Sequence, residues 1–390
     1  MRVLRELRIA IVACLTALSM TVAAAQVAGS AKTSETNPSD KLHAYLQQAA
    51  EAMHTGDLAR AERALRSAVA LDPQSMAALN NLGIVLAREG KPGQAIYFYQ
   101  QALNVRPNDG ATKRNLAIAY FKAQHYRSAL ELLEPLAAAS PNDFQLLDLA
   151  GFSLFALDRY REAAKYLERA NQADPSDMET LDMLGNAYLR LKEYKSLPSV
   201  FERIMKINPN SASAHMMMGT AYDDMSQGED AIKEYQAAIA ADPKFMGAHS
   251  GLGYLYWRKG DTENAEKEMR AELENFPNDP VANYILGKIL LNNSRPEEAR
   301  PHFEEALKVN PKYEDALIGL GEAEVALNHA NAAIAALRKA VRLDPDQAEA
   351  HFVLGTALRK SGRTEEGIRE QKLSAELQNK KAAGGKAVSQ

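Results

Sequence analysis

Prolines recur at a constant spacing of 34 residues through most of this 390-residue chain. They stand at Pro73, Pro107, Pro141, Pro175, Pro209, Pro243, Pro277, Pro311 and Pro345. Small residues keep the same frame: glycine or alanine lies 24 residues before each proline, and alanine lies 12 residues before it except at Leu197. A fixed period of roughly 20–50 residues is the signature of stacked structural repeats. The period therefore favours a repeat array over two or three compact domains.

Each unit is expected to contain two helices joined by a tight turn. We number the positions of a unit so that the recurrent proline is position 32, where it ends the second helix. Glycines mark four of the turns, at Gly56, Gly90, Gly260 and Gly362. Small residues at positions 8, 20 and 27 allow close helix packing. Because one unit cannot bury its own apolar face, neighbouring units must stack into a continuous core.

The spacing of these small, apolar and proline residues resembles the tetratricopeptide repeat. The seventh unit shows the pattern: His249-x2-Leu252-Gly253-x2-Tyr256, then Ala265-x3-Met269, then Pro277. The resemblance covers residues 42–380, and it implies an all-α fold, a right-handed superhelical α-solenoid of about ten 34-residue helix-turn-helix repeats. The repeats are expected to start near residues 42, 76, 110, 144, 178, 212, 246, 280, 314 and 348. The tenth has lost most of the apolar pattern, as a solvent-facing cap requires.

The N-terminus resembles an export signal. Three arginines precede an apolar run that ends in an A-x-A triplet at Ala25, so residues 1–25 are expected to be a signal peptide and the protein to be periplasmic or secreted. An uncleaved anchor is the alternative. Lipidation at Cys14, the only cysteine, is not expected because the apolar run continues beyond it. Residues 26–41 are expected to form a flexible linker and residues 381–390 a disordered tail.

Composition and motifs argue against several classes of function. The formal net charge of -4 gives no basic excess for nucleic acid. The chain holds no GxGxxG, Walker, HExxH or CxxC sequence, and the repeats leave no room for a catalytic domain. We therefore expect no enzyme and no cofactor.

One face of the first helix of each repeat is expected to bind the partner. At 100° per residue, positions 4, 7, 8 and 11 face the core, whereas positions 2, 5, 6, 9 and 13 face the opposite way, with position 12 at the edge. In tetratricopeptide arrays this opposite stripe lines the concave groove. The expected groove residues are Asn80, Asn81, Arg114, Asn115, Leu149, Phe152, Met183, Asn186, Met216, Met217, Tyr254, Trp257, Tyr284 and Ile285. The stripe continues through Lys288, Ile318, Glu322, Phe352 and Val353.

Two readings of this stripe stay open. Methionine and aromatic side chains suit an adaptable binding surface, but some of them could instead pack against the neighbouring repeat. Asn81 and Asn115 share position 6, where related repeats of O-linked N-acetylglucosamine transferase use an asparagine ladder to hold a peptide backbone. In the run His215-Met-Met-Met-Gly219, only Met216 and Met217 are expected in the groove, since successive helical residues diverge by about 100°.

The sequence thus predicts a non-enzymatic protein-protein interaction scaffold of the cell envelope. It would bind an extended peptide or a partner helix in the groove. The resemblance implies roles in envelope assembly, pilus biogenesis, secretion or polysaccharide export. Partners are expected to be proteins or peptides and not nucleic acid, with membrane association only through a partner or an uncleaved anchor. The alternative is a periplasmic ligand or copper carrier that uses groove methionines and histidines such as His215 and His249.

Overall fold

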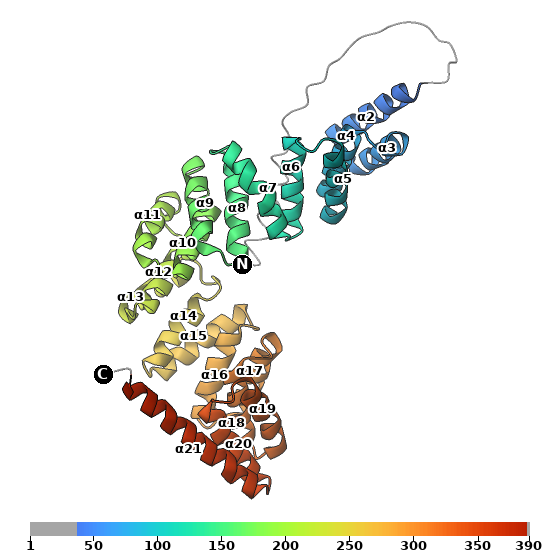
Figure 1. Ribbon diagram of the computed structural model, residues 1–390. Coiled ribbons are helices and arrows are strands. Elements are labelled where there is room, and N and C mark those ends of the chain that lie inside the picture. The colour runs from blue at the N-terminus through green and yellow to red at the C-terminus, as the bar shows by residue number, and fades with distance from the viewer. Residues whose placement is uncertain (1–36, 388–390) are drawn as a thin grey trace. The chain divides into compact units, whose positions relative to one another are not determined.

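The computed structural model describes residues 37–387, and every regular element in that range is helical (Figure 1). The chain divides after Ile207 into two compact units. The first contains α2 (Pro38–Thr55), α3 (Leu58–Leu71), α4 (Met76–Arg88), α5 (Pro92–Val105), α6 (Gly110–Lys122), α7 (Tyr126–Ala139), α8 (Phe144–Ala156), α9 (Tyr160–Ala173), α10 (Met178–Leu191), the 3-10 helix η1 (Tyr194–Ser196) and α11 (Leu197–Ile207). Five repeats make up this unit.

The second unit contains the other five repeats. Its helices are α12 (Ala212–Asp224), α13 (Gly228–Ala241), α14 (Ala248–Arg258), α15 (Thr262–Asn275), α16 (Pro280–Asn292), α17 (Pro296–Val309), α18 (Glu314–Ala326), α19 (Ala330–Leu343), α20 (Ala348–Lys360) and α21 (Thr364–Ala387). Even-numbered helices are the first helices of their repeats and odd-numbered helices are the second. Each pair packs as a hairpin against the next within its unit, which confirms the predicted solenoid of helix pairs.

A left-handed residue joins the two helices of all ten repeats. Position 15 has positive φ at the four predicted glycines and also at six other residues: Gln124, Asp158, Lys192, Ser226, Ser294 and Asn328. The N–H of the next residue donates to the carbonyl five residues earlier, as from Glu193 to Tyr188 at 2.9 Å. This Schellman bond satisfies an orphan carbonyl at the end of the first helix. The turn geometry is therefore constant even where the turn residue is not glycine.

In most repeats, a large side chain of the second helix fills the space above a glycine of the first helix. Tyr235 of α13 lies against Gly219 of its own repeat, where an added Cβ would come within 2.7 Å of the ring. The same ring meets Gly251 of the next repeat, at 2.8 Å from such a Cβ. Phe303 sits in the same way between Gly287 and Gly319. One ring therefore fixes the packing of three helices.

The first helices line the inner side of each unit. Within each unit, successive first helices contact one another, as α16 and α18 do. Successive second helices of the described chain lie farther apart. A stack whose first helices lie closer together than its second helices must curve toward the first helices. This arrangement places the first helices on the inner side, where the resemblance predicts a groove.

The two ends of the chain lie partly outside the described residues. The expected signal peptide and most of the expected linker fall in residues 1–36, for which the structure gives no placement. At the other end α21 runs to Ala387, seven residues beyond the point where we expected the repeats to end. That segment contains three alanines and two lysines, which favour helix, and two glycines, which do not. Within residues 37–387, no helix is both long and apolar enough to cross a membrane.

The ring-over-glycine packing makes a direct prediction. Gly219→Leu should lower the free energy of unfolding by about 1–3 kcal/mol, because the added side chain meets the rigid Tyr235 ring. Urea denaturation followed by far-UV circular dichroism measures the change. Gly228→Leu is the matched control, since nothing lies within 4 Å of a Cβ at that position of the same unit. Equal effects of the two substitutions would contradict this account of the core.

Candidate partner-binding surface

Four of the fourteen predicted groove residues are buried. Leu149, Met183, Met217 and Ile285 are 2, 9, 4 and 1% exposed. The expectation that their side chains face the groove is wrong. All four occupy position 6, which packs toward the second helix of the preceding repeat, as Gly251 does against Tyr235. The remaining ten are half-buried, apart from the exposed Asn186.

In the first unit, the predicted polar groove residues contact the chain itself. The side-chain oxygen of Asn80 accepts hydrogen bonds from the Thr112 hydroxyl at 3.1 Å and from the Asn115 amide at 3.3 Å. Arg114 forms an ion pair with Asp143, the residue that caps α8. These bonds connect α4 to α6, and α6 to the residue that caps α8. Asn115 thus links neighbouring repeats, in addition to any contact with a peptide.

The other predicted groove residues of the first unit are also engaged locally. The Asn186 amide donates to the backbone oxygen of Asp182 at 2.7 Å. The Phe152 ring makes an edge contact with Phe121, with 5.0 Å between ring centroids. Asn81 is half-buried. This unit's inner face is therefore held together by its own side chains.

Histidines in the second unit form side-chain contacts between the first and second helices of a repeat. The Nδ1 atom of His215 lies 2.7 Å from a carboxylate oxygen of Glu234, and that of His249 lies 2.6 Å from Glu268. The same position-4 to position-23 pairing joins His351 to Glu370 at 2.6 Å. In a fourth repeat the partners are Asn283 and His302, whose pKa is lowered by burial. These imidazoles have a structural role in the helix pairs.

The methionine run does not converge on one point. Met217 and Met218 are buried, and the methyl group of Met216 lies 3.3 Å from the position of a Cβ on Gly247. Among the described residues, no group of three or more histidine, cysteine, aspartate or glutamate side chains could hold a metal ion.

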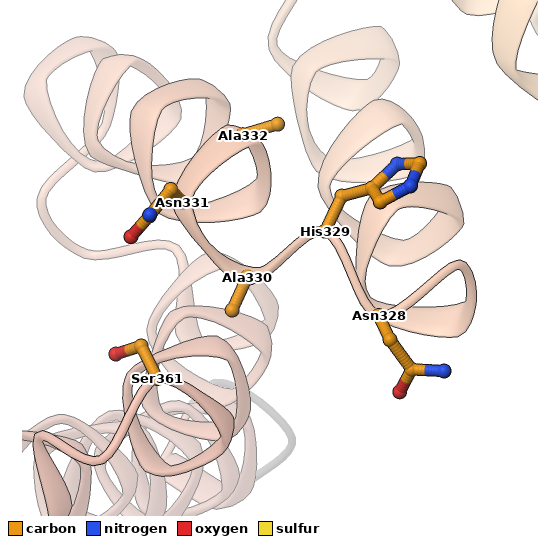
Figure 2. A pocket seen from close by; sticks show the side chains of 6 residues that line it. All are labelled: Asn328, His329, Ala330, Asn331, Ala332 and Ser361. Atoms are coloured by element: carbon orange, nitrogen blue, oxygen red, sulfur yellow. The ribbon is translucent and has the colours of Figure 1, made fainter.

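A polar pocket of about 320 Å³ lies between the turns of the last two repeats. Figure 2 shows its lining, in which the His329 ring and the Ser361 side chain point away from each other. His329 pairs with the buried Glu324 at 2.7 Å, and the Ser361 hydroxyl donates to the Leu358 carbonyl at 2.7 Å. This arrangement does not place a nucleophile against the histidine.

The second unit instead carries an aromatic cluster, made of Tyr254, Trp257 and Tyr284 of its first helices and Tyr313, which directly precedes one. Ring centroids are 6.1 Å apart for Tyr254 and Trp257, 6.4 Å for Trp257 and Tyr284, and 5.2 Å for Tyr284 and Tyr313. All four side chains are half-buried. Tyr254, Trp257 and Tyr284 pack on the core around Phe303. The core fixes these rings while part of each stays accessible.

Carboxylates lie near two rings of the aromatic cluster, Tyr284 and Tyr313. Lys288 binds Glu322 at 2.7 Å and lies 4.0 Å from Glu349, so two carboxylates share one ammonium group. Burial raises the pKa of Tyr284, and the charge of Asp315 raises it further. Burial, followed by the charges of Asp315 and Asp279, raises the pKa of Tyr313 to about 12. Acidic side chains therefore contribute negative charge near these two rings.

One residue of this surface, Tyr313, was not predicted from helical periodicity. Tyr313 directly precedes α18, at the N-cap position, where the 100° rule does not apply. Aspartate or serine caps the first helix in most other repeats, so an aromatic residue at this position was the available signal.

The paired helices and inner surfaces define an α-helical repeat protein. One tetratricopeptide repeat family model matches residues 46–111, 149–212 and 216–280, and a second matches residues 86–151 and 290–351. These matches cover more than half of the chain. The chain therefore belongs to the tetratricopeptide repeat family.

Solved structures of other repeat proteins are similar at low identity. YrrB, described as a TPR protein with an unusual peptide-binding site, is 18% identical over 49% of this chain and 98% of its own, with a TM-score of 0.42. Yeast Tom70 is 17% identical over 88% and 85%, with a TM-score of 0.43. MamA from Desulfovibrio magneticus RS-1 is 23% identical over 44% and 96%, with a TM-score of 0.41. No curated protein matches the sequence.

Two residues of the first helices, Phe352 and Ile285, differ in burial and should therefore respond differently to substitution. Phe352 is 55% exposed, so Phe352→Glu should leave far-UV helicity and the urea midpoint unchanged. Ile285→Glu should lower the free energy of unfolding by about 3 kcal/mol or more, because it buries a carboxylate. Circular dichroism during urea denaturation distinguishes the two. A large loss of stability in Phe352→Glu would show that this side chain belongs to the core.

Proposed function

We propose that this protein is a non-enzymatic scaffold of the cell envelope that binds an extended peptide or a partner helix on the inner face of its second unit. The observation that carries the proposal is the aromatic cluster, whose rings are anchored in the core and partly accessible. Half-buried tyrosine and tryptophan side chains concentrate binding energy at interfaces and lose little conformational entropy on binding.

Exposed apolar side chains on the same first helices support this proposal. Val281 of α16 is 41% exposed and Phe352 of α20 is 55% exposed. Apolar side chains grouped on one face favour a partner that covers them. Both residues lie on the helices that form the inner side of the unit. The partner is accordingly a protein or peptide that lies across several first helices.

The envelope location is part of the proposal and rests on the N-terminal sequence, where a basic segment, an apolar run and the A-x-A triplet precede Gln26. Within the envelope, the role would lie in envelope assembly, pilus biogenesis, secretion or polysaccharide export. The alternative of a soft-metal carrier finds less support: Met217 is buried, and the Nδ1 atoms of His215 and His249 face carboxylates.

Site-specific photo-crosslinking in intact cells tests the proposal. A photoreactive residue at Phe352 should capture one predominant protein, recovered with the envelope fractions. The same residue at Glu304, which is exposed on the second helix α17, is the matched control and should capture little. Identical products at both sites, or no product at Phe352, would refute the inner face as the binding surface. Products found only in the cytosol would refute the envelope location.

A further inference from the structure

We propose that the aromatic cluster and the carboxylates near Tyr284 and Tyr313 bind a cationic extended segment, which contains both lysine or arginine and apolar side chains. This inference rests on the proposed function and adds the chemistry of the partner. It follows from the arrangement of apolar and acidic side chains along the inner face, from the local charge, and from the contact of the Arg258 guanidinium with the Tyr254 ring.

One apolar and two acidic side chains follow one another across neighbouring first helices. At position 2, successive repeats carry Val281, Asp315 and Glu349. Val281 is 41% exposed, Asp315 is exposed, and the Glu349 side chain is 55% exposed. Helices pack about 8–10 Å apart, a distance that about three residues of an extended chain cover. A peptide that crosses this face can therefore place an apolar contact and a cation at neighbouring repeats.

The charge of the surface favours a cation. Lys288 is held between Glu322 and Glu349, and Asp279 and Asp315 lie near the rings and add further negative charge. The whole of residues 208–390 carries 28 acidic and 22 basic side chains. The carboxylates that disfavour a phenolate at Tyr284 and Tyr313 favour a positive charge at the same place. An acidic segment would be repelled there.

The protein already shows how a cation binds at the edge of this cluster. The Arg258 guanidinium lies over the Tyr254 ring, 5.5 Å from its centroid, and bonds to Asp223 at 2.6 Å. A cation over a tyrosine face is attracted by the ring quadrupole, and a neighbouring carboxylate adds to the attraction. Tyr284 and Tyr313 combine half-exposed rings with nearby carboxylates in the same way, and there the cation would come from the partner.

Fluorescence provides a direct test, because Trp257 is the only tryptophan of the chain and belongs to the cluster. The full chain is titrated with a synthetic peptide of repeated Arg-Leu-Lys-Tyr units and, separately, with a counterpart of repeated Glu-Leu-Glu-Tyr units. The cationic peptide should change the Trp257 emission with saturation, and salt should weaken its binding. The acidic peptide should have no effect.

Matched variants separate a local site from general attraction to an acidic protein. Asp315→Asn with Glu349→Gln should weaken binding of the cationic peptide by about tenfold, through the loss of two ionic contacts. Glu263→Gln with Glu274→Gln removes the same charge from exposed positions of the second helix α15 and should have little effect. Equal losses in the two pairs would overturn the proposed site.

The remaining outcomes also decide between proposals. If the acidic peptide changes the Trp257 emission as strongly as the cationic one, the surface binds peptides but the assigned charge is wrong. If neither peptide changes it, the cationic-segment proposal is overturned. The scaffold function is then judged separately by the crosslink at Phe352, which requires no assumption about the partner's charge.

Discussion

A large aromatic side chain packed between two glycines joins neighbouring repeats at two places in the second unit. Tyr235 lies between Gly219 and Gly251, so the two helices of one repeat and the first helix of the next meet at a single ring. This contact leaves no room for a Cβ on either glycine, and it helps set how closely successive first helices approach. Because first helices approach more closely than second helices, they line the inner side of each unit. The surface available to a partner depends on this packing.

The same packing explains why fewer positions of each first helix are accessible than helical periodicity predicts. Position 6 lies against the second helix of the preceding repeat, which leaves most residues at positions 2, 5, 9 and 12 and the N-cap residue to form the accessible surface. Ile318, at position 5, is an exception because it is only 2% exposed. The two units use this surface differently. In the first, Asn80, Asn115 and Arg114 bond to neighbouring side chains of the chain itself. In the second, the rings are fixed by the core and carboxylates lie near Tyr284 and Tyr313, and we propose that a partner binds there.

Most of the fold could be predicted from the sequence because the 34-residue period repeats the same constraints without interruption. The glycine turns were predictable at four repeats. The other six were not, since those turns carry residues other than glycine, such as Lys192, for which the left-handed conformation is uncommon. The site was harder to predict. A helical wheel treats each helix as isolated, so it assigned Ile285 to the surface although the preceding repeat buries it. It also missed Tyr313, which lies just before a helix.

The central claim is that a partner covers the inner face of the second unit. Hydroxyl-radical footprinting of the free protein and of its complex with the crosslinked partner tests this claim directly, since the radical oxidises accessible aromatic side chains. Tyr254, Trp257, Tyr284 and Phe352 should be protected in the complex, while Tyr97, which is 55% exposed on a second helix of the first unit, should react equally in both. Protection of Tyr97 with unchanged reactivity at the aromatic cluster would contradict the claim.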